Sequence, residues 1–311
     1  LLAGKQPVKQ SRTDSSDMQK TRRAWSEPNT NVIHDCVVPS LSHAKRPIYI
    51  TLRKSLYTVE TLPSLYGFCY ENAGGGGMAE QRQPATVLSA TDLTPHVRQL
   101  VIKPKTAKVA FQPGQWVSLH LPVGPKPPLN RAYSMADPSS PYGELTLVFD
   151  LVPDGLGSPY LYQLKSGDEL TLSGPYGRFI LPQTLDRELI LIGRYTGLVP
   201  MRCLLKQMFF KKIHTPVLLI AVAPSEEEVL FHQEWLTMAV QQPSFRYLPI
   251  VAEQSESQAV EKTLAMLAPL LTGQPKVIPM LCGTKAFVRP LRGYFMEQVY
   301  ERKEVKVETY D

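Results

Sequence analysis

The sequence predicts two domains of different fold class, an antiparallel β-structure followed by a parallel α/β sheet. At 311 residues the chain is long enough for two domains with separate cores. From residue 84 onward, short runs with alternating or β-branched residues are separated by Pro, Gly and Asp, as in an antiparallel barrel or sandwich. From residue 187 onward, short apolar runs alternate with helical stretches. That alternation indicates a parallel sheet with helices on both faces.

The antiparallel part has six predicted strands, with a short helix after the fifth. The strands are expected at 86–90, 97–103, 115–121, 131–136, 144–150 and 169–173. Residues 122–128 are too proline-rich for a strand and are predicted to form a long hairpin loop. Ser158 is the expected N-cap of the helix, with Pro159 at its first position. Such a helix start can bind an anion through its free N–H groups, or it can simply close one end of the β-structure.

The α/β part has five predicted strands and four predicted helices. The strands are expected at 188–193, 216–222, 245–251, 276–281 and 305–309, and the helices at 198–211, 226–241, 258–271 and 286–302. Ligands of such sheets bind at the carboxyl ends of the strands. The first strand runs there into Gly193 and Thr196-Gly197, and the fourth into Cys282-Gly283. A Gly- and Thr-containing turn between a strand and a helix is typical of a site for an anion.

Residues 1–77 differ from the rest of the chain in having no sustained hydrophobic period. They end in four glycines, 74–77, which we expect to form a flexible linker before Met78. We expect an irregular or disordered N-terminal extension, either upstream of a natural start at Met78 or serving as a transit peptide or small regulatory arm. The predicted domains are therefore 1–77, 78–186 and 187–311.

Charge and cysteine content exclude several classes of protein. The net charge of +6 is mild, and no cluster of Lys and Arg with interleaved aromatics indicates nucleic-acid binding. The four cysteines, Cys36, Cys69, Cys203 and Cys282, are too scattered for a zinc or iron–sulfur site, so no metal is expected. So few cysteines suit a reducing compartment, and we expect a cytoplasmic protein. No apolar run reaches the length of a membrane span.

The segment 128–134 carries the strongest local chemistry. Arg131 and Tyr133 are two residues apart, so on a strand they share a face, and Ser134 follows directly. A guanidinium can bind a phosphate while the neighbouring ring stacks on a flat heterocycle, and the hydroxyl adds a donor at the edge of that heterocycle. The tetrapeptide alone is a weak signal, but further motifs follow it.

Six blocks occur in a fixed order along the chain. They are Arg131-Ala-Tyr-Ser134, Gly155-Leu-Gly-Ser158 with Leu161, Gly174-Pro-Tyr-Gly177, Gly193 with Thr196-Gly197 and Pro200, Cys282-Gly283, and Glu308-Thr-Tyr310. With these blocks, residues 84–311 resemble the ferredoxin-NADP reductase family, in its bacterial flavodoxin-reductase and oxygenase-reductase branch. The resemblance implies a six-stranded FAD-binding β-barrel followed by a five-stranded NAD(P)-binding sheet.

The resemblance also implies an activity. It implies an FAD-dependent oxidoreductase that moves a hydride from NAD(P)H to the flavin. Electrons then pass to a separate acceptor, which is a ferredoxin, a flavodoxin, an oxygenase component or a small molecule. The mildly basic charge would suit docking to an acidic electron carrier.

On the flavin side, the resemblance assigns a role to each matching residue. Arg131 contacts the FAD pyrophosphate, Tyr133 lies against the isoalloxazine, and Ser134 bonds near flavin N5. The loop and helix start that hold the pyrophosphate contain Gly155, Gly157 and Ser158.

On the nucleotide side, the resemblance assigns the pyrophosphate of NAD(P)H to the turn formed by Gly193, Thr196, Gly197 and Pro200. Cys282, followed by Gly283, is expected beside the nicotinamide ring, and Tyr310 is expected to cover the flavin until nicotinamide displaces it. The implied catalytic residues are Ser134, Cys282, Glu308 and Tyr310.

Two features depart from the family pattern. Arg194 and Tyr195 stand where the family has small residues. Arg194 could pair with a phosphate, or Tyr195 could obstruct the nicotinamide; the obstruction favours as an alternative an FAD-binding redox sensor or electron-transfer subunit with impaired nucleotide binding. After the second strand of the α/β part, the acidic run 226–228 would repel a 2′-phosphate and so favours NADH over NADPH. The alternative for that run is a capping box formed by Ser225 and Glu228.

Overall fold

The computed structural model describes residues 81–311 apart from 254, 274–275, 299 and 311. The predictions for the extension 1–77, its glycine linker and Met78 lie outside these residues. The β-structure and the α/β sheet contact each other and belong to the same compact unit of the chain. Within the described residues, no helix combines the length and apolarity needed to cross a bilayer.

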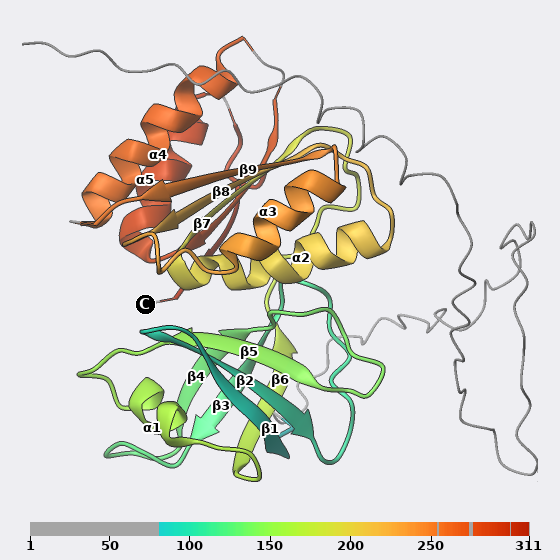
Figure 1. Ribbon diagram of the computed structural model, residues 1–311, viewed down its shortest axis with the longest axis vertical. Coiled ribbons are helices and arrows are strands. Elements are labelled where there is room, and N and C mark those ends of the chain that lie inside the picture. The colour runs from blue at the N-terminus through green and yellow to red at the C-terminus, as the bar shows by residue number, and fades with distance from the viewer. Residues whose placement is uncertain (1–80, 254, 274–275, 299, 311) are drawn as a thin grey trace, which may run out of the picture. The chain divides into compact units, whose positions relative to one another are not determined.

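The first half of the described chain is a closed antiparallel barrel (Figure 1). Its six strands in the described chain are β1 (Gln83–Thr94), β2 (Val97–Pro104), β3 (Trp116–Leu121), β4 (Leu129–Ser134), β5 (Leu145–Asp150) and β6 (Glu169–Tyr176), in the order β4-β3-β6-β1-β2-β5. Met135, which follows β4, forms an antiparallel bridge with Leu147 of β5. The next residue, Ala136, donates its N–H to the Thr146 carbonyl at 2.8 Å. These bonds join the two outer strands, so the barrel rather than the sandwich is confirmed.

The second half is a parallel sheet with the predicted alternation of strands and helices. Its strands are β7 (Leu189–Arg194), β8 (Val217–Ala223), β9 (Phe245–Val251), β10 (Ile278–Gly283) and β11 (Lys306–Thr309), in the order β11-β10-β7-β8-β9. Its helices are α2 (Leu198–Phe210), α3 (His232–Gln241), α4 (Glu256–Leu271) and α5 (Lys285–Glu297). The predicted boundary after residue 186 falls between β6 and β7.

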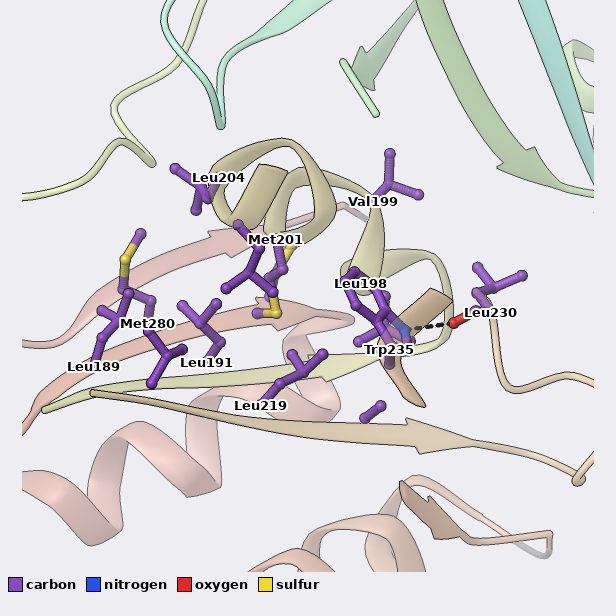
Figure 2. Packing of buried hydrophobic residues seen from close by; sticks show 14 of the residues in the cluster. Leu189, Leu191, Leu198, Val199, Met201, Leu204, Leu219, Leu230, Trp235 and Met280 are labelled. Carbon is purple, nitrogen blue, oxygen red and sulfur yellow. Dashed lines mark hydrogen bonds between the residues drawn. The ribbon is translucent and has the colours of Figure 1, made fainter. Parts of the chain in front are cut away.

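Helices cover both faces of this sheet, α2 and α3 on one side and α4 and α5 on the other (Figure 1). Alternate residues of β7 therefore enter different cores: Leu191 packs with α2 and α3, whereas Ile190 packs with α4 and α5. In Figure 2 the Trp235 indole lies in the first of these cores and donates Nε1–H to the Leu230 carbonyl at 2.8 Å. Both faces are buried, which explains why these strands read as continuous apolar runs.

The short helix of the barrel begins earlier than the sequence predicts. Helix α1 spans Gly157–Gln163, with Leu156 at the N-cap position. Ser158 lies inside the helix, and its Oγ accepts a hydrogen bond from the Val152 N–H at 2.9 Å. The prediction of Ser158 as the N-cap is wrong, because its hydroxyl is hydrogen-bonded to the preceding loop and not to the first N–H groups of the helix.

The helix predicted at 226–241 begins six residues late. Helix α3 starts at His232, because Phe231 before it adopts a left-handed backbone with φ of 59°, which a continuous α-helix does not allow. The capping box of Ser225 and Glu228 is therefore absent from this segment: Ser225 Oγ donates to Glu227 at 3.0 Å, and Glu228 is buried. The acidic run was not a helix start but a turn with one inward carboxylate.

Candidate active site

A cavity of about 600 Å³ brings the barrel motifs and the first turn of the α/β half together. Its walls come from β4, from β5 with the loop after it, and from the segment between β7 and α2. Eight of the residues predicted from sequence line it: Arg131, Tyr133, Ser134, Gly155, Gly157, Ser158, Thr196 and Tyr310. A volume of this size is in the range of ligand-binding clefts.

Strand β4 supplies the aromatic and basic walls. Tyr133 is half-buried and packs its ring against Phe149, with 5.5 Å between the ring centroids. Burial raises the pKa of the Tyr133 hydroxyl, so the phenol stays protonated. Arg131 is exposed and donates through Nη1 to the Asn130 carbonyl at 2.9 Å. The strand therefore presents a neutral ring and a cation to the same cavity.

The loop and helix after β5 form the opposite wall. A Cβ atom on Gly157 would lie 3.3 Å from both the Arg131 Cγ and the Leu121 Cδ1, so a larger residue would crowd the arginine. Ser158 accepts the Val152 N–H at 2.9 Å, and its own hydroxyl hydrogen can still donate to a ligand. A cation, small residues and a hydroxyl are the groups expected around a pyrophosphate.

Ser134 is bonded to the last strand of the chain. Its Oγ donates to Glu308 Oε1 at 2.9 Å, which joins the end of β4 to β11. Burial raises the pKa of Glu308 to about 7, although the bond from Ser134 lowers it in part. Near neutral pH this carboxyl is therefore divided between its two protonation states and can hold or release a proton beside Ser134.

The C-terminal tyrosine lies across the turn that follows β7. The Tyr310 hydroxyl donates to the Arg194 carbonyl at 3.3 Å and lies 3.4 Å from Thr196 Oγ1. Its side chain lines the cavity, and 36% of the residue remains exposed. The Cys282 thiol is fully buried and does not reach the cavity wall. Burial raises the pKa of Cys282, so this thiol stays protonated.

The remaining predicted residues shape the turn without lining the cavity. A Cβ atom on Gly197 would lie 2.3 Å from the Cys282 carbonyl oxygen, so only glycine fits there. On Gly193 it would lie 2.8 Å from Leu198 Cδ2, and Pro200 is buried in α2. Gly283 has a φ of +156° and lies under Arg194.

Arg194 and Tyr195 are both held by carboxylates. Arg194 Nε donates to Glu256 Oε1 at 2.7 Å. Tyr195 has a left-handed backbone, with φ of 52°, and its hydroxyl donates to Glu228 Oε2 at 2.8 Å. The Tyr195 ring is thus directed to Glu228 and is not among the side chains that line the cavity.

The sequence did not reveal the contacts of three carboxylates around this site. Glu228 accepts hydrogen bonds from Thr94 and His96 of the barrel as well as from Tyr195. Asp150 lines the cavity at the end of β5, where Thr196 Oγ1 donates to it at 3.3 Å and burial raises its pKa. Glu256 pairs with Arg194. For Asp150, the available signal was an acid that ends an apolar strand; no pattern in the sequence identifies the partners of the other two.

Comparison with known proteins identifies both halves. Residues 84–180 match the oxidoreductase FAD-binding domain, and residues 191–292 match the oxidoreductase NAD-binding domain. Ferredoxin--NADP reductase B of Sorangium cellulosum is 27% identical over 237 residues, which cover 73% of this chain and 97% of that protein. Reductase component 2 of terephthalate 1,2-dioxygenase from Comamonas sp. is 30% identical and covers 58% of this chain. This chain spans only 53% of that longer protein.

Solved structures share the fold. The ferredoxin-NADP+ reductase of Plasmodium falciparum superimposes with a TM-score of 0.64 at 17% identity, covering 74% of this chain and 96% of that one. The Amycolatopsis cytochrome P450 reductase GcoB gives 0.63 at 23% identity, covering 76% and 72%. With a barrel and a sheet of this topology and both family matches in order, the chain belongs to the ferredoxin-NADP reductase family of flavin- and NAD(P)-dependent oxidoreductases.

Proposed function

We propose that this protein is an FAD-dependent reductase that accepts a hydride from NAD(P)H and delivers electrons to a separate acceptor. One observation carries the proposal: a single cavity gathers Arg131 and Tyr133 from the barrel with Thr196 and Tyr310 from the α/β half. A flavin bound there would be reached from both domains. Family membership supports the same assignment.

The residues of the cavity fit a flavin dinucleotide. Arg131, with the small residues at 155 and 157, would hold the pyrophosphate, and the neutral Tyr133 ring would pack against the isoalloxazine. When Glu308 is protonated, it would donate to the Ser134 oxygen, and the Ser134 hydroxyl hydrogen would then be released to donate to the flavin edge. When bound, FAD accepts a hydride and releases electrons singly or in pairs. The protein orients the two rings and excludes water.

Tyr310 would cover the ring-binding end of the cavity in the absence of nicotinamide. Its hydroxyl is bonded to the Arg194 carbonyl on the α/β side, and the residue is partly exposed and lines the cavity. Cys282 would act as a positioning residue, since its side chain is fully buried and its carbonyl oxygen lies against Gly197 in the turn that Tyr310 covers.

We infer a preference for NADH. Glu226 and Glu227 follow the carboxyl end of β8 and are both exposed, so they would repel a 2′-phosphate. Glu228, in contrast, is turned toward the barrel and contributes nothing to this repulsion.

For the acceptor, we propose a ferredoxin, a flavodoxin or an oxygenase component. The terephthalate dioxygenase component supports the last of these, although this chain spans only about half of it. The two described cysteines are buried free thiols, which suits the cytoplasm.

The test is anaerobic mixing of the FAD-loaded protein with NADH and, separately, with NADPH, following the oxidised-flavin absorbance at about 450 nm. Rapid bleaching by NADH, and slower bleaching by NADPH, is expected. A flavin that neither nucleotide reduces would contradict the reductase assignment.

A second candidate is an FAD-binding redox sensor or electron-transfer subunit with impaired nucleotide binding. It is favoured by the two large side chains at 194 and 195, which the structure pairs with Glu256 and Glu228. If Arg194→Gly combined with Tyr195→Gly gains nucleotide-dependent flavin reduction that the parent lacks, this candidate is supported. Activity in the parent excludes it.

A further inference from the structure

Three polar side chains meet at the carboxyl edge of the parallel sheet. Arg194 ends β7, Glu256 opens α4, and Thr284 is the N-cap of α5. Arg194 Nε donates to Glu256 Oε1 at 2.7 Å, and Thr284 Oγ1 donates to Glu256 Oε2 at 3.0 Å. The Glu256 carboxylate is thus bound on both oxygens, by a guanidinium and by a hydroxyl.

The Arg194 guanidinium is incompletely satisfied by this partner. Its Nη1 is one of three buried side-chain polar atoms without a hydrogen-bond partner among the described residues. A buried donor that stays unpaired costs free energy, so its retention indicates a partner that the protein alone does not supply. The Arg194 side chain is 11% exposed and that of Glu256 34%. Glu256 is therefore the more accessible member of the pair and the one that can move aside.

The position of the pair identifies the ligand chemistry. Arg194 lies two residues before Thr196, a cavity-lining residue, and its carbonyl accepts the Tyr310 hydroxyl. Ligands of a parallel sheet bind at the carboxyl ends of its strands, so a nucleotide that brings its nicotinamide to this end of the cavity would carry its diphosphate past the end of β7. A diphosphate has two negative charges and several acceptor oxygens, so it can satisfy Nε, Nη1 and the Thr284 hydroxyl together.

We propose that Arg194 is the receptor for the diphosphate of the pyridine dinucleotide, and that Glu256 occupies this position until the nucleotide displaces it. The inference rests on the proposed function and adds a competitor built into the binding site. The large residue at 194 thereby acquires a role. Instead of backbone N–H groups alone, the Arg194 guanidinium binds the diphosphate, and it can do so only after Glu256 has moved away from it.

Isothermal titration of the FAD-loaded protein with ADP-ribose, which carries the diphosphate but cannot reduce flavin, tests this proposal. Glu256→Gln removes the competing charge and is expected to lower the Kd about tenfold, whereas Arg194→Met is expected to raise it by about the same factor. In the double variant, the gain from Glu256→Gln should disappear. Glu261→Gln, an exposed carboxylate of the same helix, is the matched control and should leave the Kd unchanged.

A Kd for ADP-ribose that is unchanged or higher in Glu256→Gln overturns the proposal. Absence of ADP-ribose binding to both wild type and Glu256→Gln overturns it as well. If the ion pair of Arg194 and Glu256 is purely structural, Glu256→Gln should lower the thermal stability of the protein without strengthening ADP-ribose binding. The result is separable from the proposed function. If NADH reduces the wild-type flavin and the Kd for ADP-ribose is unchanged in Glu256→Gln, then Glu256 is not a competitor of the nucleotide, whereas the reductase assignment is retained. If neither NADH nor NADPH reduces the flavin, the reductase assignment itself is excluded.

Discussion

Replacement of Glu228 by glutamine should destabilise the protein far more than an ordinary surface substitution. The Glu228 side chain is 8% exposed and accepts three hydrogen bonds, from Thr94 Oγ1 at 2.5 Å, His96 Nδ1 at 2.9 Å and the Tyr195 hydroxyl at 2.8 Å. Two of these donors belong to the barrel and one to the turn after β7. The carboxylate therefore joins the two halves of the protein.

The magnitude follows from the change in acceptor. A hydrogen bond to a charged group contributes about 1.5–3 kcal/mol, against about 0.5–1.5 kcal/mol for a neutral pair. Glutamine retains the shape but loses the charge, and its amide nitrogen cannot accept a hydrogen bond. With that nitrogen turned to the exposed His96, water replaces the bond from His96 at a cost of about 1 kcal/mol, and the bonds from Thr94 and Tyr195 each weaken by about 1 kcal/mol. The expected loss in the free energy of unfolding for Glu228→Gln is thus about 3 kcal/mol, summed over these bonds.

Equilibrium unfolding in urea, followed by circular dichroism, measures this loss. Glu227→Gln is the matched control, because Glu227 is exposed and accepts a bond from Ser225 at 3.0 Å; its effect should stay within about 0.5 kcal/mol. A Glu228→Gln protein as stable as the control would refute the reasoning.

The same carboxylate predicts a dependence on pH. Burial alone would raise the pKa of Glu228, but the hydrogen bonds from Thr94, His96 and Tyr195 lower it below its ordinary value of 4.5. Its contribution is therefore fully present above that value and is lost as the pH falls through the lower, folded pKa. The difference between wild type and Glu228→Gln should shrink in acid, and a difference that persists unchanged at about pH 3 would contradict this assignment.

Three further predictions concern the interior of the site. Burial raises the pKa of Glu308 from 4.5 to about 7, so the folded protein binds one proton more than the unfolded chain in this range and loses stability as the pH rises through it. Between pH 5 and 8, the free energy of unfolding of Glu308→Gln should therefore rise relative to that of wild type by at most about 3 kcal/mol, as measured by urea titration. A difference that does not change with pH would contradict this. Gly197→Ala places a Cβ 2.3 Å from the Cys282 carbonyl oxygen, so it should lower Tm by an amount equivalent to a loss of about 3 kcal/mol in the free energy of unfolding. Gly293→Ala in helix α5, where no atom lies within 4 Å of the added Cβ, should raise Tm. The buried thiols of Cys203 and Cys282 should not react with a disulfide reagent until urea is added, in a protein whose other cysteines are serine; rapid labelling of the folded protein would refute their burial.

Some features of this protein followed from the sequence because they depend on local pattern. The alternation in the first half and the apolar runs in the second each reflect which faces of a strand are buried, so the strands were located closely. Arg131, Tyr133 and Ser134 were found because neighbouring strand positions have fixed directions, and they line one cavity. The helix starts were less accurate: Ser158 bonds the preceding loop, and Phe231 interrupts the expected helix before α3.

Contacts between distant segments depend on how those segments pack together in the folded protein. Glu228 reads as a helix-capping residue in the sequence, yet its partner Thr94 lies 134 residues away. The pair of Arg194 and Glu256 spans 62 residues, and that of Ser134 and Glu308 spans 174. The succession of strands and helices along the chain, and which residues share a face of a strand, followed from the sequence because they depend on periods of two and 3.6 residues. Which carboxylate meets which donor depends on how the barrel and the sheet pack, and no local period records that packing.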